Sequence, residues 1–387
     1  MTPPPAPPPP PAPPLELCPG RWVGGSHPAF VIAEIGQNHQ GDLQTAKKMI
    51  SAARSAGADC VKFQKSNLKE KFNEAALARE YSGPQSWGRT YGEHKAHLEL
   101  SEEDYRELQD HAHREGVFFT ASAMDSESAR FLELLQVPFV KLGSGDSNNL
   151  GLQLEVARRG RPMVVSTGMC SMAWVRTLVA ALTATTEKVV VMQCTSSYPT
   201  APADVRLGVM ETFRREFPAI NIGYSGHETG LAISVAAAAL GATVIERHFT
   251  LDKSWKGSDH RCSLEPGEME ILCHHVRNNT QFLDLKQLFT SQEMDEVQEA
   301  LEGSDKELLQ SELACQAKLG KTIVAKHDIA KNTVISADDI LIKVADPRGI
   351  DPLCEDLYIG RVALSNIKAD CSIQSSMLGL NSTTAFL

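Results

Sequence analysis

The sequence lacks several features that would assign it to a common class. No apolar run is long enough to span a bilayer, and no secretory signal peptide is recognisable at its start. The net charge is −10 and no stripe of Lys and Arg stands out. This argues against a nucleic-acid partner, because phosphate neutralisation needs clustered cations. We therefore expect a cytoplasmic protein that binds neither membranes nor nucleic acids.

The nine cysteines also lack a recognisable pattern. None forms a C-x-x-C pair, and several lie within apolar runs, such as Cys60 in ADCVKF and Cys194 in VMQCT. An odd number spread in this way is typical of reduced thiols in a protein core rather than of a disulfide framework. The cysteines thus favour a reducing compartment, in agreement with a cytoplasmic location.

What the chain does contain is a repeated alternation of short apolar runs with longer amphipathic segments. Eight runs are rich in Val, Ile and Phe, as expected for strands buried on both faces. They are residues 30–36, 60–65, 117–122, 139–144, 163–168, 189–195, 220–226 and 243–250. Eight strand–helix units within about 250 residues indicate an α/β fold of the (β/α)8 TIM-barrel type. A doubly wound sheet is the alternative, but no G-x-G-x-x-G motif follows the first strand.

Composition divides the chain into five segments. Residues 1–14 are almost all proline, which predicts a disordered tail. Residues 15–283 form the predicted barrel domain, and the acidic, helix-prone residues 284–317 are interpreted as a helical linker. Short strands with turn residues then predict a small β-rich domain at 318–378, followed by a tail at 379–387.

One connection within the barrel is too long for the repeat. Residues 66–100 separate the second strand from its helix and contain several aromatic residues and cations. A loop of that size after a barrel strand lies at the C-terminal face and usually has a functional role.

The ends of the predicted strands carry the candidate site, because active sites of TIM barrels lie there. Two lysines and several serines converge on this face, which predicts a site for phosphate and carboxylate groups. They are Lys62, Lys141, Ser122, Ser144, Ser166 and Ser225. Glu34, Gln64, Asp146, Ser196, Tyr198 and Asp259 follow the strands as well. Glu246, inside the last strand, is interpreted as a structural carboxylate paired with Arg247 or with a lysine.

Two histidines end the last two strands. Neighbouring strands lie about 4.8 Å apart, so His227 and His248 could share one metal ion. Two imidazoles with room for oxygen ligands suit Mg²⁺ or Mn²⁺. The alternative is that each histidine is structural. The strand ends as a whole favour a metal-dependent enzyme that binds a phosphorylated ligand.

Seven motifs occur in order along the chain. They are AEIGQNHQGD (33–42), KFQKS (62–66), KLGSGDSNN (141–149), STGM (166–169), QCTSSYP (193–199), GYSGHETG (223–230) and ERHFTLDKSWKGSDH (246–260). Together they resemble the N-acetylneuraminate synthase family, and its animal members in particular. The similarity runs from Leu15 to about Phe282 and resumes near Lys306, and the C-terminal domain resembles the antifreeze-like (SAF) domain of that family.

The resemblance implies a reaction and a role for each site residue. Phosphoenolpyruvate would condense with N-acetylmannosamine 6-phosphate (mannose 6-phosphate is a further candidate) and water, giving N-acetylneuraminate 9-phosphate and phosphate. The implied metal ligands are His227 and His248. The positions implied to hold phosphoenolpyruvate are Lys62, Ser122, Lys141, Ser144, Ser166, Ser196 and Ser225. Those implied to surround the sugar are Glu34, Gln64, Asp146, Tyr198 and Asp259. Among all of these, Glu34, Lys62, Lys141 and Asp259 are predicted to be catalytic.

The resemblance further implies a homodimer in which the SAF domain of one chain caps the barrel of the other. The sequence differs from bacterial relatives at Asp146 and Ser196, where those commonly carry Glu and Asn. It also has Asp346 before Pro347, where bacterial relatives place an Arg. Lys69, Lys71 and Arg79 in the long connection are candidate contacts for a sugar phosphate.

Three alternatives remain at this point. The sugar could be unphosphorylated N-acetylmannosamine. The chain could be a Schiff-base aldolase that uses Lys141 or Lys62 as its nucleophile. It could also be a non-catalytic binding protein whose SAF domain carries the activity.

Overall fold

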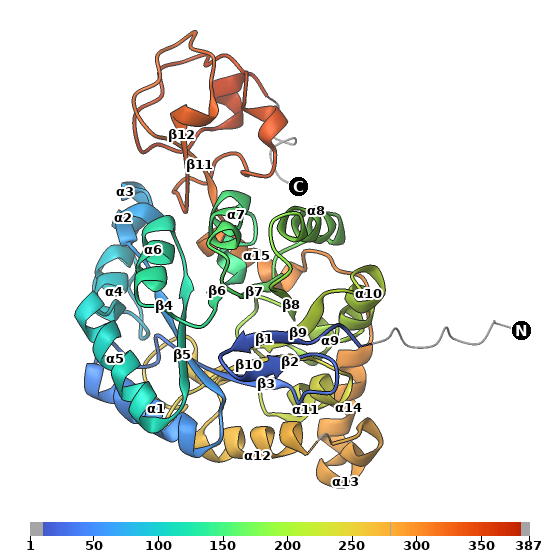
Figure 1. Ribbon diagram of the computed structural model, residues 1–387. Coiled ribbons are helices and arrows are strands. Elements are labelled where there is room, and N and C mark those ends of the chain that lie inside the picture. The colour runs from blue at the N-terminus through green and yellow to red at the C-terminus, as the bar shows by residue number, and fades with distance from the viewer. Residues whose placement is uncertain (1–10, 279, 381–387) are drawn as a thin grey trace, which may run out of the picture.

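The computed structural model describes residues 11–278 and 280–380, and its main body is a closed barrel of eight parallel strands (Figure 1). Around the barrel the strands follow the order β10-β3-β4-β5-β6-β7-β8-β9. Their bounds are β3 Phe30–Gly36, β4 Cys60–Lys65, β5 Phe118–Ala123, β6 Val140–Leu142, β7 Met163–Ser166, β8 Val189–Cys194, β9 Asn221–Gly226 and β10 Val244–His248. The predicted TIM barrel is confirmed, and closure excludes the doubly wound sheet.

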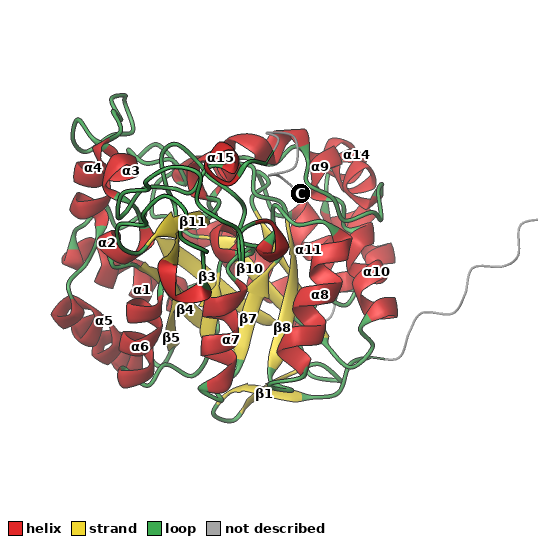
Figure 2. Cartoon of the chain, turned by 90° about the horizontal axis from the view of Figure 1, so that it is seen from above, coloured by secondary structure: helices red, strands yellow, loops and turns green. Residues whose placement is uncertain are grey.

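A helix follows each barrel strand and lies on the outside of the barrel (Figure 2). These helices are α1 Leu43–Ser55, α5 Glu102–Glu115, α6 Ser126–Leu134, α7 Leu150–Arg158, α8 Met172–Thr183, α10 Gly208–Glu216, α11 Ala232–Ala239 and α12 Pro266–Arg277. Helix α5 shows how the local sequence sets its bounds. Ser101 and Asp104 form a capping box at its start, and Gly116 ends it with φ of 74°, in the left-handed region that favours glycine.

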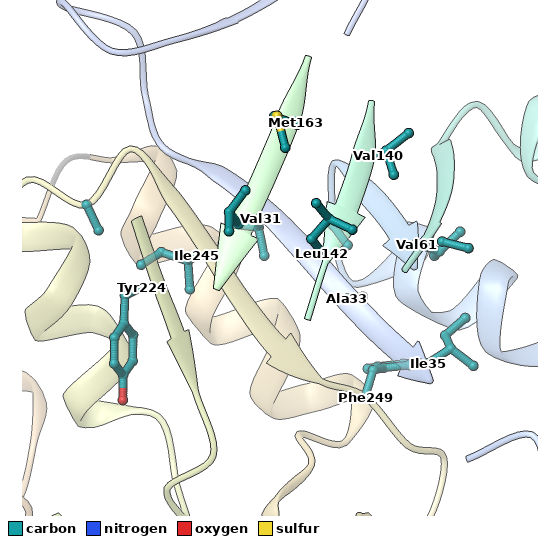
Figure 3. Close-up of a cluster of buried hydrophobic side chains, with 14 of the residues drawn as sticks. Val31, Ala33, Ile35, Val61, Val140, Leu142, Met163, Tyr224, Ile245 and Phe249 are labelled. Carbon is teal, nitrogen blue, oxygen red and sulfur yellow. The ribbon is translucent and has the colours of Figure 1, made fainter. Parts of the chain in front are cut away.

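Successive side chains of the barrel strands point alternately into two hydrophobic cores, one inside the barrel and one between the barrel and its helices. In β3, Phe30 and Ile32 point into the barrel, whereas Val31, Ala33 and Ile35 pack outward against the helices (Figure 3). The same alternation sends Glu34 inward at the end of the strand, next to Lys62 of β4 in the register. The layered interior therefore changes from apolar at the N-terminal ends of the strands to charged at the C-terminal ends.

A short hairpin that the sequence patterns did not predict covers the base of the barrel. Strands β1 (Leu15–Cys18) and β2 (Arg21–Val23) pair in antiparallel fashion. Leu17 and Val23 pack with side chains from the beginning of the barrel strands. Within the predicted proline tail, residues 1–10 lie outside the described residues. Ala12 accepts a hydrogen bond from Gly25 N, and the carbonyl of Pro13 accepts one from Asn221.

The segment after α12 is helical, as expected, and it packs on the barrel. It contains α13 Leu285–Leu288, α14 Ser291–Leu301 and α15 Leu313–Leu319. Helix α14 packs against α11 and the short helix α9 (Pro202–Val205), and its Val297 and Ala300 belong to the outer core of the barrel. This segment thus adds to the barrel domain instead of merely joining two domains.

The C-terminal domain has a small core of its own around β11 (Thr322–Ala325) and β12 (Ile340–Lys343), which pair in antiparallel fashion. It meets the long connection 66–100, which contains α2 Leu68–Lys71, α3 Glu74–Ala78 and α4 Tyr91–Leu98. Val344 exchanges backbone hydrogen bonds of 2.8 and 2.9 Å with Lys71 and Asn73. The domain is therefore fixed to the long connection of its own chain.

All nine cysteines are free thiols, and seven of them are buried. Among the described residues, every helix is too short or too polar to cross a bilayer.

Candidate active site

The C-terminal ends of the barrel strands surround a cavity of about 250 Å³. The structure brings together around it all fourteen predicted site residues: Glu34, Lys62, Gln64, Ser122, Lys141, Ser144, Asp146, Ser166, Ser196, Tyr198, Ser225, His227, His248 and Asp259. A second cavity, of about 340 Å³, lies near the opposite ends of β9 and β10. Most of its lining residues are apolar, and the lining contains His27, Arg214 and His275 but none of the fourteen predicted site residues.

Two buried lysines share the carboxylate of Glu246 in the wall of this cavity. Glu246 Oε1 lies 3.6 Å from the Nζ atom of Lys62 and 3.7 Å from that of Lys141. Lys62 Nζ lies 2.7 Å from Glu34 Oε2 as well. The sequence left either Arg247 or a lysine as the partner of Glu246, and in the structure the partners are the two lysines. Arg247 faces outward and pairs with Glu228 at 2.8 Å.

Serine hydroxyls complete the coordination of both ammonium groups. Lys62 donates a hydrogen bond of 2.9 Å to Ser122, and Lys141 donates one of 2.7 Å to Ser166. Burial lowers the pKa of Lys141, although Glu246 opposes this. Burial also opposes ionisation of Glu246, but the two lysines outweigh it and hold the pKa of that carboxyl below its usual value. These groups form a preorganised cationic surface that suits a small anion.

Close backbone approach shapes the neighbouring part of the wall. Gly168 N donates a hydrogen bond of 3.0 Å to Ser144 Oγ. A Cβ atom at Gly168 would lie 2.2 Å from Ser196 Oγ and 2.6 Å from Ser144 Oγ, so a larger residue would displace both hydroxyls. Ser196 Oγ is buried and has no hydrogen-bond partner among the described residues. A buried hydroxyl of this kind is suited to a ligand.

Glu312 supports this wall from the segment between the two domains. Its carboxylate is fully buried and accepts hydrogen bonds of 2.8 Å from the backbone N–H groups of Met169 and Ser196. Sequence reasoning missed Glu312, because this residue follows no strand. A buried acidic residue in a polar segment gives no periodic signal by which to find it.

The two histidines lie side by side and fit a shared metal ion. Their ring centroids are 5.4 Å apart. His227 Nδ1 lies 2.9 Å from the carbonyl oxygen of Thr195, which can only accept, so Nδ1 carries a proton. Burial opposes a second proton on this ring, but the neighbouring Cys194 outweighs burial and raises the pKa of His227. His248 Nδ1 is buried without a hydrogen-bond partner among the described residues. Burial lowers the pKa of His248 to about 3, which keeps it in the neutral form that binds metals.

The predicted sugar-side residues line the same cavity, next to the lysines and the histidines. Gln64 donates a hydrogen bond of 2.9 Å to Glu34 Oε1. Asp259 Oδ2 lies 3.9 Å from His248 Nδ1. Asp146 Oδ1 lies 3.1 Å from the Nζ atom of Lys321, at the start of the C-terminal domain. Asp146 therefore already has a charged partner, which sequence reasoning did not foresee.

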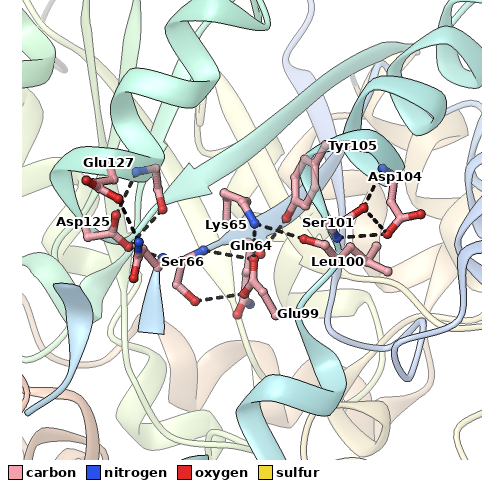
Figure 4. Close-up of polar contacts among 12 residues, drawn as sticks. Gln64, Lys65, Ser66, Glu99, Leu100, Ser101, Asp104, Tyr105, Asp125 and Glu127 are labelled. Carbon is pink, nitrogen blue, oxygen red and sulfur yellow. Dashed lines mark hydrogen bonds and ion pairs between the residues drawn. The ribbon is translucent and has the colours of Figure 1, made fainter. Parts of the chain in front are cut away.

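The long connection 66–100 is held in place at both of its ends (Figure 4). Lys65, just before it, donates a hydrogen bond of 2.7 Å to Glu99, near its end. Ser66 Oγ donates one of 3.0 Å to the other oxygen of the same carboxylate. Tyr105 OH donates one of 2.6 Å to the carbonyl of Gln64. The segment is thus a fixed part of the rim of the cavity.

Further cations at the rim extend the predicted site. Lys71 of α2, Lys95 of α4 and Lys318 of α15 line the cavity together with Tyr91. Among the three candidate phosphate contacts in the long connection, only Lys71 lines the cavity. Lys69 and Arg79 do not.

Comparison with protein-family models gives two matches. The NeuB family matches residues 49–287, and the SAF domain matches residues 320–379. The first match covers the larger part of the barrel, and the second covers the C-terminal domain.

Known proteins are similar over nearly the whole chain. The chain is 50% identical to the N-acetylneuraminate-9-phosphate synthase of Homo sapiens over 94% of its length and 96% of that protein. It is 47% identical to the synthase of the same name from Drosophila melanogaster, over 88% of the chain and 93% of that protein. The crystal structure of the spore coat polysaccharide biosynthesis protein SpsE from Bacillus subtilis superimposes with a TM-score of 0.74 at 29% identity, covering 93% of this chain and 98% of that one.

Proposed function

The chain belongs to the NeuB family, and we propose that it condenses phosphoenolpyruvate with N-acetylmannosamine 6-phosphate to give N-acetylneuraminate 9-phosphate and phosphate. The observation that carries this proposal is the cationic wall of Lys62 and Lys141 with their serines, set beside the His227–His248 pair in one cavity. The names of the human and fly relatives support the product. Mannose 6-phosphate is a further candidate sugar.

Phosphoenolpyruvate is the ligand proposed for the cationic wall. Its phosphate and carboxylate groups would neutralise part of the positive charge of the lysines, which Glu246 and Glu34 neutralise in its absence. Ser144 and Ser196 add hydroxyl donors next to Gly168, whose small size brings the backbone close. A charged site with fixed donors stabilises developing negative charge more strongly than water does, because its dipoles are already oriented.

The reaction forms one C–C bond and one C–O bond, the latter from water, and breaks the C–O bond between C2 and the phosphate. The C3 carbon of phosphoenolpyruvate attacks the aldehyde carbon of the open-chain sugar, and the aldehyde oxygen takes up a proton. The positive charge that develops on C2 is met by water, which adds and loses a proton. The tetrahedral centre then collapses to a ketone as inorganic phosphate leaves. Glu34, which contacts Lys62 and Gln64, is proposed to accept or donate protons near the sugar hydroxyls. Asp259 is proposed to assist beside His248.

His227 and His248 are the residues that would hold a divalent ion, Mg²⁺ or Mn²⁺. Such an ion, when bound, supplies Lewis-acid polarisation of the aldehyde oxygen. The hydrogen bond between His227 Nδ1 and Thr195 fixes the tautomer of that ring. The buried Nδ1 atom of His248 and the neutral state of its ring agree with this assignment.

We also propose that the protein works in the cytoplasm as a homodimer. The nine free thiols support a reducing compartment. None of the described residues after Leu319 lines the cavity. This supports the proposal that the SAF domain caps the barrel of a second copy. A cap would exclude water and strengthen the electrostatic interactions inside.

Phosphate release from phosphoenolpyruvate tests the reaction. The purified chain should release phosphate only when a mannosamine sugar and a divalent ion are both present, and EDTA should abolish turnover. The Schiff-base alternative predicts instead that borohydride with pyruvate traps an adduct on Lys141 or Lys62, and that EDTA has no effect. A trapped adduct, or the absence of phosphate release with any mannosamine sugar, would overturn the synthase assignment.

Mixing two inactive chains tests the cap. A chain truncated before Leu319 keeps its barrel but lacks the SAF domain, whereas His227→Ala keeps the domain but lacks one metal ligand. Mixed dimers would pair an intact barrel with the cap of the other chain, so activity should return. Heterodimers that form but stay inactive would rule out capping across chains. The truncated chain alone serves as the control and should stay inactive.

A further inference from the structure

Three lysines from separate segments meet at the rim of the cavity. Lys71 and Lys95 come from the long connection, and Lys318 comes from α15, more than 200 residues later. The Nζ atoms of Lys95 and Lys318 both lie 5.6 Å from the centroid of the Tyr91 ring. The fold thus gathers positive charge around one aromatic side chain.

These lysines have no carboxylate partner among the described residues. Lys71 Nζ donates to Met124 Sδ at 2.7 Å, and a thioether is a weak acceptor. Lys95 Nζ donates to the amide oxygen of Gln37 at 2.7 Å. Lys318 Nζ lies over aromatic rings, 5.4 Å from the centroid of Tyr81.

Other lysines around the same face are paired, so the absence of partners is particular to this cluster. Lys65 binds Glu99, Lys321 lies 3.1 Å from Asp146, and Lys343 lies 2.9 Å from Asp370. Asp259, in the wall of the same cavity, acts on Lys95 and Lys318 through its charge, but it forms no ion pair with either of them among the described residues.

The cluster is costly without a negative partner. Burial, together with the charge of Lys95, lowers the pKa of Lys71 to about 7. Burial likewise lowers the pKa of Lys95 to about 8, with Lys318 adding to the effect. Lys71 and Lys95 are thus destabilised as cations by burial and by a neighbouring positive charge, and an anion beside them would relieve both effects. Burial also opposes the charge of Lys318, but Tyr91 and other neighbours outweigh it and raise the pKa of that lysine.

We propose that Lys71, Lys95 and Lys318 form the subsite that binds the 6-phosphate of the sugar. This inference rests on the proposed function and adds the residues that select a phosphorylated substrate. A phosphate dianion offers three acceptor oxygens to three ammonium donors.

The position of the cluster agrees with the shape of the substrate. The reacting aldehyde carbon belongs at the strand ends, where Lys62, Lys141 and the two histidines lie. The 6-phosphate is at the other end of an open six-carbon chain, so it must lie away from the strands. The three lysines come from the helices α2, α4 and α15 and not from the barrel strands. Lys65 and Glu99 hold the first two of these segments in place.

The test compares two sugars on the full-length chain with a divalent ion present. kcat/KM is measured by phosphate release with N-acetylmannosamine 6-phosphate and with N-acetylmannosamine. Wild type should prefer the phosphorylated sugar. Lys95→Gln and Lys318→Gln should each lower kcat/KM for the phosphorylated sugar by about 10- to 100-fold, mainly through KM, as expected for the loss of one charge-assisted hydrogen bond. The same variants should use the unphosphorylated sugar as well as wild type does, which also shows that they fold.

Two further variants serve as controls. Lys256→Gln removes an exposed lysine whose Nζ lies 4.7 Å from the Trp87 ring centroid, outside the cavity, and should keep the preference of wild type. Lys318→Arg keeps the charge and should retain most of the preference. If the lysine variants lose activity equally on both sugars, or if wild type does not distinguish the sugars, the subsite is refuted while the synthase stands. Absence of phosphate release from wild type with both sugars would refute the synthase and the subsite together.

Discussion

The sharing of one carboxylate by two lysines makes Glu246→Gln an informative substitution. Lys62 keeps a carboxylate in this variant, because its Nζ also lies 2.7 Å from Glu34. Lys141 loses Glu246, 3.7 Å away, which is the one carboxylate that pairs with it among the described residues. The two ammonium groups should therefore respond differently, and Lys141 should respond more strongly.

The size of the effect follows from the distances. Two unit charges about 4 Å apart attract by about 4 kcal/mol at an effective dielectric constant of about 20, and one pKa unit corresponds to about 1.4 kcal/mol. Relaxation of the site and the hydrogen bond to Ser166 reduce this effect. We expect the alkaline limb of the pH profile of kcat/KM for phosphoenolpyruvate to move to lower pH by about 1 to 3 units. The direction is downward because an amine that binds its proton more weakly loses its charge, and its hold on an anion, at lower pH.

The assay is kcat/KM for phosphoenolpyruvate, measured by phosphate release at saturating sugar from about pH 6 to about pH 11, a range that includes the ordinary lysine pKa of about 10.4. Glu99→Gln is the matched control. It removes a partner 2.7 Å from a different lysine, Lys65, in a pair that does not line the cavity. Its alkaline limb should coincide with that of wild type. An unmoved limb in Glu246→Gln would refute the reasoning, and so would equal displacement in both variants.

Other expected outcomes concern the metal, the wall and the rim. His227→Ala and His248→Ala should fold but lose most Mn²⁺ binding in calorimetry and most turnover; full activity in metal-depleted buffer would contradict the metal site. Gly168→Ala should raise KM for phosphoenolpyruvate by about 10- to 100-fold, because the new methyl group displaces two hydroxyl donors; an unchanged KM would count against that wall. The preference for the phosphorylated sugar should fall as pH rises through about 7 and about 8, where Lys71 and Lys95 lose their charge; a constant ratio of kcat/KM for the two sugars would disagree.

The barrel was predictable because its strands carry an unusually plain signal. Residues 30–36 and 60–65 coincide with β3 and β4, since strands buried on both faces are continuous apolar runs between polar segments. The run at 139–144 extends too far, because Ser144–Asp146 form a 3-10 turn that presents polar groups to the cavity. The hairpin at the base was missed. Its strands have four and three residues, too few to show a period.

The site residues also divide into those that the sequence predicted and those that it did not. Residues on the strands were found because parallel strands must deliver their last inward side chains to one face. Glu312 and Lys318 were not found, since their place depends on how the segment after α12 folds back over the barrel. Lys71 was a candidate only alongside Lys69 and Arg79, and sequence could not separate them. Short helices and caps decide which of three nearby cations points into the cavity, and these depend on tertiary contacts.

This division has a consequence for how the substrate is selected. Groups that act on the reacting carbon atoms belong to strands that are hydrogen-bonded on both sides and packed in the core, so their spacing resists change. The groups proposed to bind the sugar phosphate belong to an insertion and to α15, which can vary without disturbing the barrel register. Charge at the rim can then change the preferred sugar while the chemistry at the strand ends stays the same. The Lys318 variants separate these two functions, because a rim residue should change KM for the phosphorylated sugar and leave kcat unchanged for both sugars.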